Sequence, residues 1–524
     1  MGELWHKHWR LARTRMGPQA NFLVDTADRA AYLCTRKEKI MPRHSFFYKN
    51  TLWIGVLSLI LAALVAGSCS EKPKSADLEI KPTPAPALRP ESEVRLSNDP
   101  KVTEAFRDAG LGLFIHWGPN SQIGSEISWP LHNASEDYVR KYYALAETFN
   151  PEKFDPASWA RLAKLARMGY VVFTTKHHDG FCMFDTALSD FKITRMPYGK
   201  DITAMVAEAF QREKIPVGFY YSPGDVRYFH ETGWKSPGSV YDVDFGATAP
   251  FGPLKKSFVD YERGQIEELL TRYGDIFLLW FDGSCDPLKK YAWRVKQDVF
   301  IGRDEIKTPE QFIPGEVADI PWESCMTTSR QWSYKPNPEV VGIKEILQNL
   351  IRIRARGGNL LLNVGPRPDG VIAPPDEALL RELGLWMMSN EEGIRGVRPW
   401  IRSNEGDVWF TQRKRDGTIY AFVDLAFGFE GKGDPWPMGR ALDLRTVRAT
   451  PATKITILGQ AGECPWTQDA RGLHVRVVGT QTIQIVKAPS TKAGSPSTWN
   501  WGTDWPVTLK ITAAGPVPET AKTQ

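Results

Sequence analysis

Two carboxylic acids in the chain lie where acid–base chemistry on a bound molecule is feasible. Asp282 ends the apolar run LLWF and precedes a glycine, which lets the backbone turn and a ligand approach closely. Glu323 lies in Pro321–Met326 (PWESCM), where the adjacent tryptophan favours a raised pKa and an acid/base role. Because a buried carboxylate is costly, each group must be paired or used. On separate strand ends, Asp282 as nucleophile and Glu323 as acid/base would provide the two carboxyl groups that glycosidic-bond hydrolysis needs.

The residues by themselves do not select this pair. Asp282 fits the N-cap of a helix that follows a strand nearly as well. Glu323 fits an ion-paired framework position equally well. The other candidate carboxylates for the same chemistry are Glu126, Asp225, Glu310 and Glu316.

Histidines follow two of the predicted strands. His116 and Trp117 come directly after the run LGLFI, where the imidazole can donate to a ligand hydroxyl and the indole can form a wall. His177 and His178 are adjacent, and adjacent residues in an extended segment point to opposite faces. One of them can therefore enter a pocket while the other packs behind it. A lone histidine at a strand end is more often structural, so these residues alone do not define a site.

A metal site is the competing interpretation of the histidines. Two histidines and an aspartate can bind zinc or iron, but barrel hydrolases of that kind use a His-x-His pair, which the body of the chain lacks. The six cysteines are scattered and form no Cys-x-x-Cys pair, which argues against a thiolate zinc site. We therefore expect no metal and no cofactor, and a metal-dependent hydrolase stays an alternative that a chelator would test.

Short apolar runs alternate with amphipathic segments from about Asn98, which predicts βαβ units and a parallel sheet. The strands are apolar throughout, as in sheets buried on both faces. Polar side chains gather after the strands, and in a (β/α)8-like TIM barrel these ends form the active-site face. A doubly wound open sheet is the alternative fold. Strands are predicted over 111–117, 170–175, 217–222, 275–281 and 359–364, and helices over 154–168, 201–213, 261–273, 342–356 and 376–390.

The pattern changes after about Val397, where short strands follow one another without helices. This pattern predicts a small C-terminal β-sandwich over 398–488, after a catalytic barrel over 98–397. Residues 489–524 are polar and rich in proline, and we expect a loose tail. The predicted sandwich strands are 407–412, 418–425, 453–458, 473–478 and 482–486.

The N-terminal part is predicted to direct export. The apolar run over 52–67 follows basic residues and precedes Cys69, as in an export signal. The small residues before Cys69 are similar to the lipobox of bacterial lipoproteins, and an ordinary membrane anchor is the alternative. Met41 would give the signal a normal start, so we interpret 1–40 as a non-native upstream extension and 41–69 as the signal. We expect a periplasmic or outer-membrane lipoprotein, or a secreted protein.

The amino-acid composition and net charge limit the classes of molecule that the protein is expected to bind. Residues 70–97 are rich in Pro, Lys and Glu and read as a linker. The net charge of +5 comes without a dense basic block, so nucleic acid is not an expected partner. The 19 tryptophans lean slightly towards carbohydrate, because flat apolar rings suit the faces of sugars.

Taken together, these stretches resemble the α-L-fucosidases of glycoside hydrolase family 29, from about Glu104 to about Trp400. Such a long ordered set is far more specific than any one motif. The family has a barrel of this kind followed by a β-sandwich, which agrees with the two-part organisation above. The stretches that carry the resemblance are GLFIHWGP, FNPEKFDPASWARLAKLARMGY, TTKHHDGFCMFDTALSDF, YYSPGD, LLWFDG, TPEQ, PWESCMT and GGNLLLNVGPRPDG.

The resemblance implies roles for individual residues. Asp282 matches the nucleophile, which forms a covalent fucosyl–enzyme intermediate. Glu323 resembles the acid/base of the subgroup with the motif W-E-x-C, although the position of this residue varies between subgroups. The implied contacts to fucose hydroxyls are His116, His177 and His178, and the implied pocket walls are Tyr221 and Trp280, beside the wall already inferred for Trp117.

The sequence also departs from the family pattern. Fucosidases commonly carry Gly-Glu-Trp after the His-Trp-Gly strand, whereas this chain has GSEISW, so Glu126 and Trp129 have no secure match. Ser333 stands where related enzymes have the glycine of Trp-Gly-Tyr, and 226–250 is individual. Because of these departures, the resemblance does not determine which leaving group the enzyme prefers. It also leaves the identity of the sugar open.

The expected function is that of a retaining exo-α-L-fucosidase acting on fucosylated oligosaccharides or polysaccharides, with a possible membrane tether through Cys69. One alternative keeps the mechanism and changes the sugar to another galactose-configured unit. A non-catalytic carbohydrate-binding protein is the alternative from another class.

Overall fold

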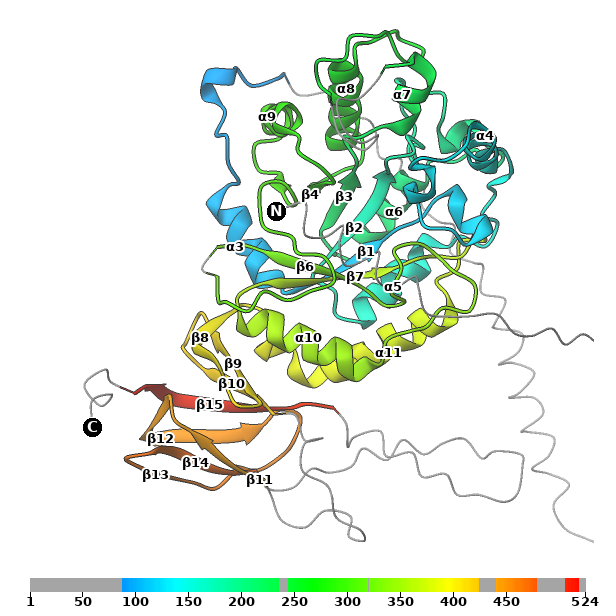
Figure 1. Ribbon diagram of the computed structural model, residues 1–524. Coiled ribbons are helices and arrows are strands. Elements are labelled where there is room, and N and C mark those ends of the chain that lie inside the picture. The colour runs from blue at the N-terminus through cyan, green and yellow to red at the C-terminus, as the bar shows by residue number, and fades with distance from the viewer. Residues whose placement is uncertain (1–86, 235–243, 319, 424–439, 478–504, 518–524) are drawn as a thin grey trace, which may run out of the picture. The chain divides into compact units, whose positions relative to one another are not determined.

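The computed structural model describes residues 87–234, 244–318, 320–423, 440–477 and 505–517 (Figure 1). A parallel α/β part is followed along the chain by antiparallel sheets. None of the described helices is long and apolar enough to cross a membrane. The predicted export signal and Cys69 lie outside the described residues, as does most of the predicted linker.

Seven strands form one parallel sheet in the order β5-β4-β3-β2-β1-β7-β6, as in a (β/α) barrel. The register pairs Ile115 with Phe173 on one side and with Val364 on the other, so residues that follow these strands reach one edge. Polar groups that follow the strands therefore converge, as the sequence predicted. The strands are β1 Leu111–Ile115, β2 Tyr170–Lys176, β3 Val217–Tyr221, β4 Ile276–Phe281, β5 Phe300–Ile301, β6 Glu323–Thr327 and β7 Asn359–Val364.

The two outer strands of this sheet, β5 and β6, are linked by an extended segment, Lys307–Gln311. Isolated parallel bridges join Lys307 to Trp322 and Glu310 to Cys325, beside β6. A further bridge joins Arg303 to Ile306 just after β5. The segment thus occupies the place of a strand between β5 and β6, and neither of these two strands was among those predicted from the sequence.

Helices follow most of the strands. The helix predicted from Asp155-Pro156 forms as expected, because the Asp155 side chain accepts from the Ala157 N–H and the proline occupies the first turn. All five predicted helices are present within a few residues of the expected bounds. The helices are α3 Pro100–Ala109, α4 Glu136–Ala144, α5 Pro156–Leu165, α6 Ile202–Arg212, α7 Val226–Thr232, α8 Phe258–Thr271, α9 Asp286–Val295, α10 Ile343–Ala355 and α11 Pro374–Asn390.

Alternate residues of the parallel strands pack into two separate cores. One face contributes Phe114, Tyr220, Trp280, Cys325 and Leu361 to a buried cluster inside the sheet. The opposite face packs against the helices in a second, larger cluster. Both faces are buried, which explains why the strand sequences are apolar throughout.

Two antiparallel sheets follow the parallel part and share one apolar core. The predicted β-sandwich is therefore present, with one sheet in the order β12-β15-β10-β9-β8 and the other in the order β11-β14-β13. The predicted strand over 482–486 lies outside the described residues. The strands are β8 Val397–Glu405, β9 Val408–Arg413, β10 Ile419–Val423, β11 Arg440–Leu444, β12 Val447–Ile457, β13 Trp466–Asp469, β14 Gly472–Val477 and β15 Val507–Pro516.

The prediction of a loose tail over 489–524 is wrong for β15. This strand lies between β10 and β12 and pairs with both. Leu509 and Ile511 are two residues apart, so they point to the same face of the strand. Both are fully buried in the sandwich core. The sandwich therefore extends beyond residue 488, and its last strand occupies an inner position of the larger sheet.

Candidate active site

A cavity of about 290 Å³ opens at the carboxyl ends of the parallel strands. Its lining comes from β1, β3 and β4, together with segments that follow β1, β2, β4, β5 and β6. Charged and imidazole groups share the surface with aromatic rings. The lining residues are Phe114, His116, Trp129, His177, His178, Tyr220, Trp280, Asp282, Gly283, Arg303, Glu310 and Trp332.

Asp282 follows the last residue of β4 and is held by three donors. The Tyr220 hydroxyl donates to Oδ2 over 2.7 Å. His178 Nε2 lies 3.2 Å from the same oxygen, and Arg303 Nε lies 3.3 Å from Oδ1. Gly283 adopts a φ of 144°, which L side chains rarely adopt, so glycine allows the turn that leaves Asp282 in the cavity.

These donors keep Asp282 ionised. Burial alone would raise its pKa, but the hydrogen bond from His178 and the charge of Arg303 outweigh burial. The pKa of Asp282 therefore lies well below its ordinary value of 3.8. A carboxylate that stays charged at every physiological pH can act as a nucleophile or stabilise a positive charge.

The three predicted histidines all reach the cavity, each with Nδ1 engaged by a polar side chain. His116 Nδ1 lies 2.7 Å from Asn363 Oδ1, and His177 Nδ1 lies 2.7 Å from Ser128 Oγ. His178 Nδ1 contacts the Ser222 hydroxyl. These contacts orient the rings, so that His178 Nε2 reaches Asp282.

Burial keeps two of these imidazoles neutral. It lowers the pKa of His116 to about 4, although the hydrogen bond with Asn363 acts in the opposite direction. Burial also lowers the pKa of His177 well below its ordinary value, and the neighbouring His178 adds to this effect. A neutral imidazole can donate or accept one hydrogen bond, which suits the recognition of hydroxyl groups.

Aromatic rings form the walls of the cavity. Tyr220 stacks between His177, at 5.0 Å between ring centroids, and Trp280, at 5.4 Å. Phe114 packs edge-on against Trp280 and Trp332. Trp129 lines the mouth and is 50% exposed. Such rings present flat apolar surfaces to a ligand.

Glu310 is a second carboxylate in the cavity. Its side chain is 41% exposed and forms an ion pair with Arg303. The guanidinium of Arg303 thereby contacts both Glu310 and Asp282, and it lies 5.0 Å above the ring of Trp280. Glu310 was predicted from the sequence only as one of the further candidate carboxylates, and Arg303, Tyr220 and Trp332 were not predicted as site residues.

Glu323 does not reach this cavity. It is the first residue of β6, so its side chain lies at the amino end of the strand and not at the carboxyl end that the prediction assumed. The side chain is fully buried, with Oε2 accepting from the Tyr170 hydroxyl at 2.6 Å and Oε1 accepting from Trp280 Nε1 at 2.7 Å. Burial raises the pKa of Glu323 to about 7, although the two hydrogen bonds act to lower it.

Two predicted wall residues also lie outside the cavity. Trp117 is buried against Phe149 and Trp159, and its indole N–H donates to the Arg367 carbonyl. Tyr221 donates to Gln265 and lies under the Lys176 ammonium group. In β3 it is the preceding Tyr220 that lines the cavity, because consecutive strand residues point to opposite faces.

The remaining candidate carboxylates have structural surroundings. Asp225 is buried beside Lys176, which also bonds Glu262 at 2.6 Å. Glu126 accepts from the backbone N–H groups of Trp332 and Ser333, and so joins two loops at the cavity mouth. Glu316 is exposed and does not line the cavity.

One group in the described residues has the spacing of metal ligands. His177, His178 and Asp282 offer atoms within 4.8 Å of one another. The Asp282 oxygens already contact Tyr220 and Arg303, and the cationic guanidinium opposes a metal cation at this position. The donor set therefore fits a carboxylate that acts directly better than one that binds a metal.

An ionised carboxylate, oriented histidines and aromatic walls at the carboxyl ends of a parallel barrel define a glycoside hydrolase. The model of one family, Alpha-L-fucosidase, matches residues 87–392. The chain belongs to the alpha-L-fucosidase family.

Curated and solved proteins agree with this placement. The chain is 29% identical to the tissue alpha-L-fucosidase of Rattus norvegicus, over 70% of this chain and 83% of that protein. It is 26% identical to an alpha-L-fucosidase of Branchiostoma floridae, over 76% of this chain and 91% of that protein. Among solved structures, alpha-L-fucosidase isoenzyme 1 from Paenibacillus thiaminolyticus superposes with a TM-score of 0.61 at 28% identity, covering 79% of this chain and 98% of that one.

Proposed function

We propose that the enzyme removes terminal α-L-fucose from glycans with retention of configuration. Asp282 acts as the nucleophile and Glu310 as the acid/base. The observation that carries this proposal is the cavity itself, in which these two carboxylates meet one guanidinium, that of Arg303. Glu323 is not assigned the acid/base role because its buried carboxylate has both oxygens engaged away from the cavity.

The reaction proceeds in two displacements. An Asp282 oxygen attacks the anomeric carbon while the glycosidic C–O bond breaks, and Glu310 gives its proton to the leaving oxygen. The product of this step is a fucosyl ester of Asp282. A water molecule then attacks the same carbon, Glu310 takes one of its protons, and the ester bond breaks to release fucose and the Asp282 carboxylate.

Arg303 suits the change of role that Glu310 makes between the two steps. The ion pair favours ionised Glu310, which is the form that accepts a proton from water in the second step. Glu310 must be protonated for the first step, so the entering glycan has to weaken its contact with Arg303. Glu310 is partly exposed at the cavity mouth, where it can be protonated from solvent and move.

The arrangement favours retention over inversion. Retaining enzymes hold their carboxyl groups about 5 Å apart, whereas inverting enzymes need several ångströms more to admit a water molecule between sugar and base. Here one guanidinium contacts both groups, with its Nε 3.3 Å from Asp282 and its Nη1 paired with Glu310. This shared contact keeps the two carboxylates close together.

The aromatic walls favour a 6-deoxy sugar. L-Fucose is 6-deoxy-L-galactose, so these two L sugars differ only at C6, where fucose carries a methyl group. Phe114, Trp280 and Trp332 give the cavity an apolar wall, on which a methyl group loses less hydration than a hydroxymethyl group. Another galactose-configured substrate is the second candidate, and 4-nitrophenyl α-L-galactoside, which differs from the fucoside only at C6, would detect it.

The decisive experiment follows the anomer of fucose that forms first. Proton NMR of a reaction with 4-nitrophenyl α-L-fucoside should show α-fucose before mutarotation equilibrates the anomers. Initial β-fucose would contradict the double displacement. In the Asp282→Gly variant, azide should restore turnover and give β-fucosyl azide, because azide then replaces the missing nucleophile on the opposite face of the sugar. Turnover of the same substrate that is unchanged in chelator would exclude a metal-dependent hydrolase.

We infer export of the enzyme from the apolar run over 52–67, and a lipid tether at Cys69 from the small residues that precede it. A tethered enzyme would meet glycans at a membrane surface. Labelling with a radioactive fatty acid in a bacterial host tests the tether, and the Cys69→Ala variant should lose the label. A label that persists in this variant would contradict acylation at Cys69.

A further inference from the structure

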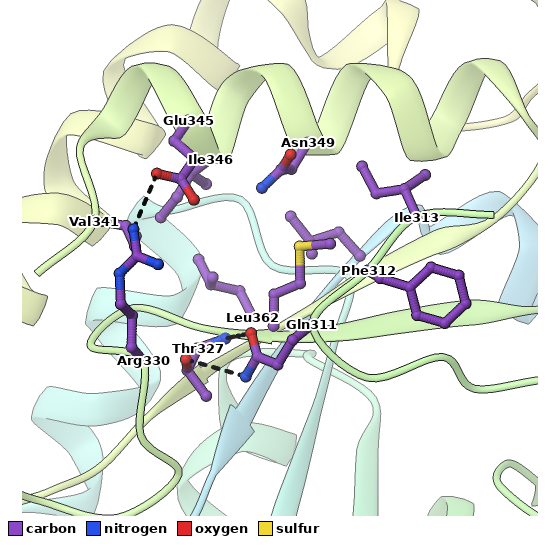
Figure 2. A pocket seen from close by; sticks show the side chains of 12 residues that line it. Gln311, Phe312, Ile313, Thr327, Arg330, Val341, Glu345, Ile346, Asn349 and Leu362 are labelled. Atoms are coloured by element: carbon purple, nitrogen blue, oxygen red, sulfur yellow. Dashed lines mark hydrogen bonds and ion pairs between the residues drawn. The ribbon is translucent and has the colours of Figure 1, made fainter. Parts of the chain in front are cut away.

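A second cavity, of about 330 Å³, lies outside the parallel sheet (Figure 2). Helix α10 covers one side, and the outward faces of β6 and β7 form the floor. The third side is formed by Gln311, Phe312 and Ile313, which directly follow Glu310. This volume falls in the usual range for small-molecule sites, roughly 300–1,000 Å³.

The cavity exists because no helix covers this side of β6. The connection between β5 and β6 forms no helix in its described residues, 302–318 and 320–322. A barrel normally packs a helix against the outer face after each strand. After β5, residues 311–313 stand in place of that helix, and Met326, Leu360 and Leu362 line the space left beside α10.

An amide group faces this space without a partner. Figure 2 shows the Asn349 side chain below helix α10 and directed into the cavity. Its amide makes no hydrogen bond with any other residue that the structure describes. The side chain is half-buried, so its amide remains open to solvent and can bond a ligand that enters the cavity.

The other polar groups at the rim balance in charge. Arg330 and Glu345 form a loose ion pair of 4.0 Å, and both side chains remain well exposed. The Gln311 amide is already committed, because it donates to Thr327 Oγ1 at 3.1 Å. Phe312, at the rim, is 57% exposed. A rim without net charge favours a neutral ligand.

A sugar ring has the chemistry that these groups would recognise. A pyranose carries hydroxyl groups around its edge and apolar C–H groups on its faces. Asn349 and the Arg330–Glu345 pair can bond the hydroxyls, while the apolar floor and Phe312 can cover a face.

The two cavities are joined by one short segment. Glu310 lines the catalytic cavity and the next residue, Gln311, lines the second. The segment is fixed to β6 by the Gln311 N–H, which donates to the Cys325 carbonyl at 2.9 Å. A ligand packed against Gln311 and Phe312 would therefore restrain the backbone that carries Glu310.

We propose that the second cavity binds a neutral pyranose residue of a glycan, and that its occupation steadies the segment carrying Glu310. The coupling to catalysis rests on the role proposed above for Glu310, whereas the binding does not. The cavity then acts as a non-catalytic glycan site, which retains long substrates near the catalytic cavity.

The test is a calorimetric titration of the full chain carrying Asp282→Ala with the trisaccharide 2′-fucosyllactose. Two sites per chain are expected. Asn349→Leu and, separately, Phe312→Ala should remove the second site or weaken it at least tenfold, while Gln348→Ala on the same helix should not. A single site in the parent, or two unchanged sites in both cavity variants, would overturn the proposal. Thermal unfolding of each variant shows whether the fold is retained, and the exposed Phe312 is the safer substitution.

Kinetics separate this proposal from the catalytic one. In the active enzyme, Asn349→Leu should raise KM for 2′-fucosyllactose severalfold and leave kcat/KM for 4-nitrophenyl α-L-fucoside unchanged. Loss of activity on both substrates alike would contradict a separate glycan site. An active-site failure would show itself differently, as absence of fucoside hydrolysis in the parent enzyme, and the calorimetric result would still stand.

Discussion

Two carboxylates inside the same barrel end in opposite states. Asp282, at the carboxyl end of β4, meets the imidazole of His178 and the guanidinium of Arg303, and its pKa falls. Glu323, at the amino end of β6, meets only a phenol and an indole, and its pKa rises to about 7. Burial acts to raise the pKa of both groups, so burial alone does not decide their charge.

The kind of hydrogen-bond donor decides whether each carboxyl group is charged. Neutral donors return only part of the hydration that burial removes, whereas a cation adds an attraction that grows in a region of low dielectric. One end of the barrel interior therefore holds a reactive anion, and the other holds a carboxylic acid that ties β6 to β2 and β4. Substitutions at the two ends of the barrel test this division of roles, and the largest effect on turnover is expected at Asp282.

Asp282→Asn should reduce kcat by at least about 10⁴-fold, as expected when the nucleophile is lost but its shape is kept. The matched variant at the other end, Glu323→Gln, should change kcat less than about tenfold. Its amide can still bond Tyr170 or Trp280. Steady-state kinetics with 4-nitrophenyl α-L-fucoside measures both. A larger loss in Glu323→Gln with an intact fold would return the acid/base role to Glu323.

Glu310→Gln should lower kcat for fucosylated oligosaccharides by about 10²- to 10⁴-fold, the usual contribution of general acid catalysis. The loss should shrink markedly for a substrate with an activated leaving group, such as 2,4-dinitrophenyl α-L-fucoside, because that group departs without a proton. Equal losses on both kinds of substrate would exclude Glu310 as the general acid. Glu316→Gln, outside the cavity, serves as the control.

Arg303→Met should lower kcat/KM at neutral pH by about tenfold, as for the loss of one hydrogen bond to a charged group. The charge of Arg303 lowers the pKa of Asp282, so its removal raises that pKa. The acid limb of the kcat/KM profile should then move to higher pH. An unmoved limb would show that His178 and Tyr220 are sufficient to hold Asp282 ionised.

The last prediction concerns the free energy of unfolding and not turnover. It depends on Glu323, at the amino end of β6. The pKa of Glu323 is about 7 in the folded protein and 4.5 ordinarily. Between these values the unfolded chain releases the proton while the folded protein keeps it, so stability falls as pH rises. The total change is about 3 kcal/mol, and none is added above pH 7.

Glu323→Gln removes this titration. Its Tm should therefore fall less than that of the parent between pH 5 and pH 8, and calorimetric unfolding across this range measures the difference. Parallel profiles for parent and variant would show that Glu323 is ionised in the folded protein.

Much of the fold followed from local patterns. Apolar runs of five to seven residues gave the strands of the barrel core, and the helix that begins after Asp155 followed from its cap. The strands β5 and β6 were missed because one has two residues and the other is interrupted by polar side chains. β15 was missed because its surroundings are rich in proline, and only its partners β10 and β12 give it a place.

The site was predictable where residues directly follow a strand. Asp282 and the three histidines could be named because a buried strand that ends in a polar residue delivers that residue to one edge of the sheet. Tyr220 and Tyr221 could not be told apart, because the face of β3 that turns inward depends on register with its neighbours. Arg303 and Glu310 lie in an irregular connection. It has no hydrophobic periodicity from which the positions of their side chains could be predicted.

The order of residues is enough to predict the family, the alternation of strands and helices, and a carboxylate with histidines at the strand ends. These features depend on short-range chemistry, which the order of residues records directly. Which second carboxylate shares the cavity with Asp282 depends on contacts between distant parts of the chain. Whether a strand begins or ends at Glu323 depends on hydrogen bonds to β7, far away in the chain. Whether Glu310 meets Arg303 depends on how the connection between β5 and β6 folds back on the barrel.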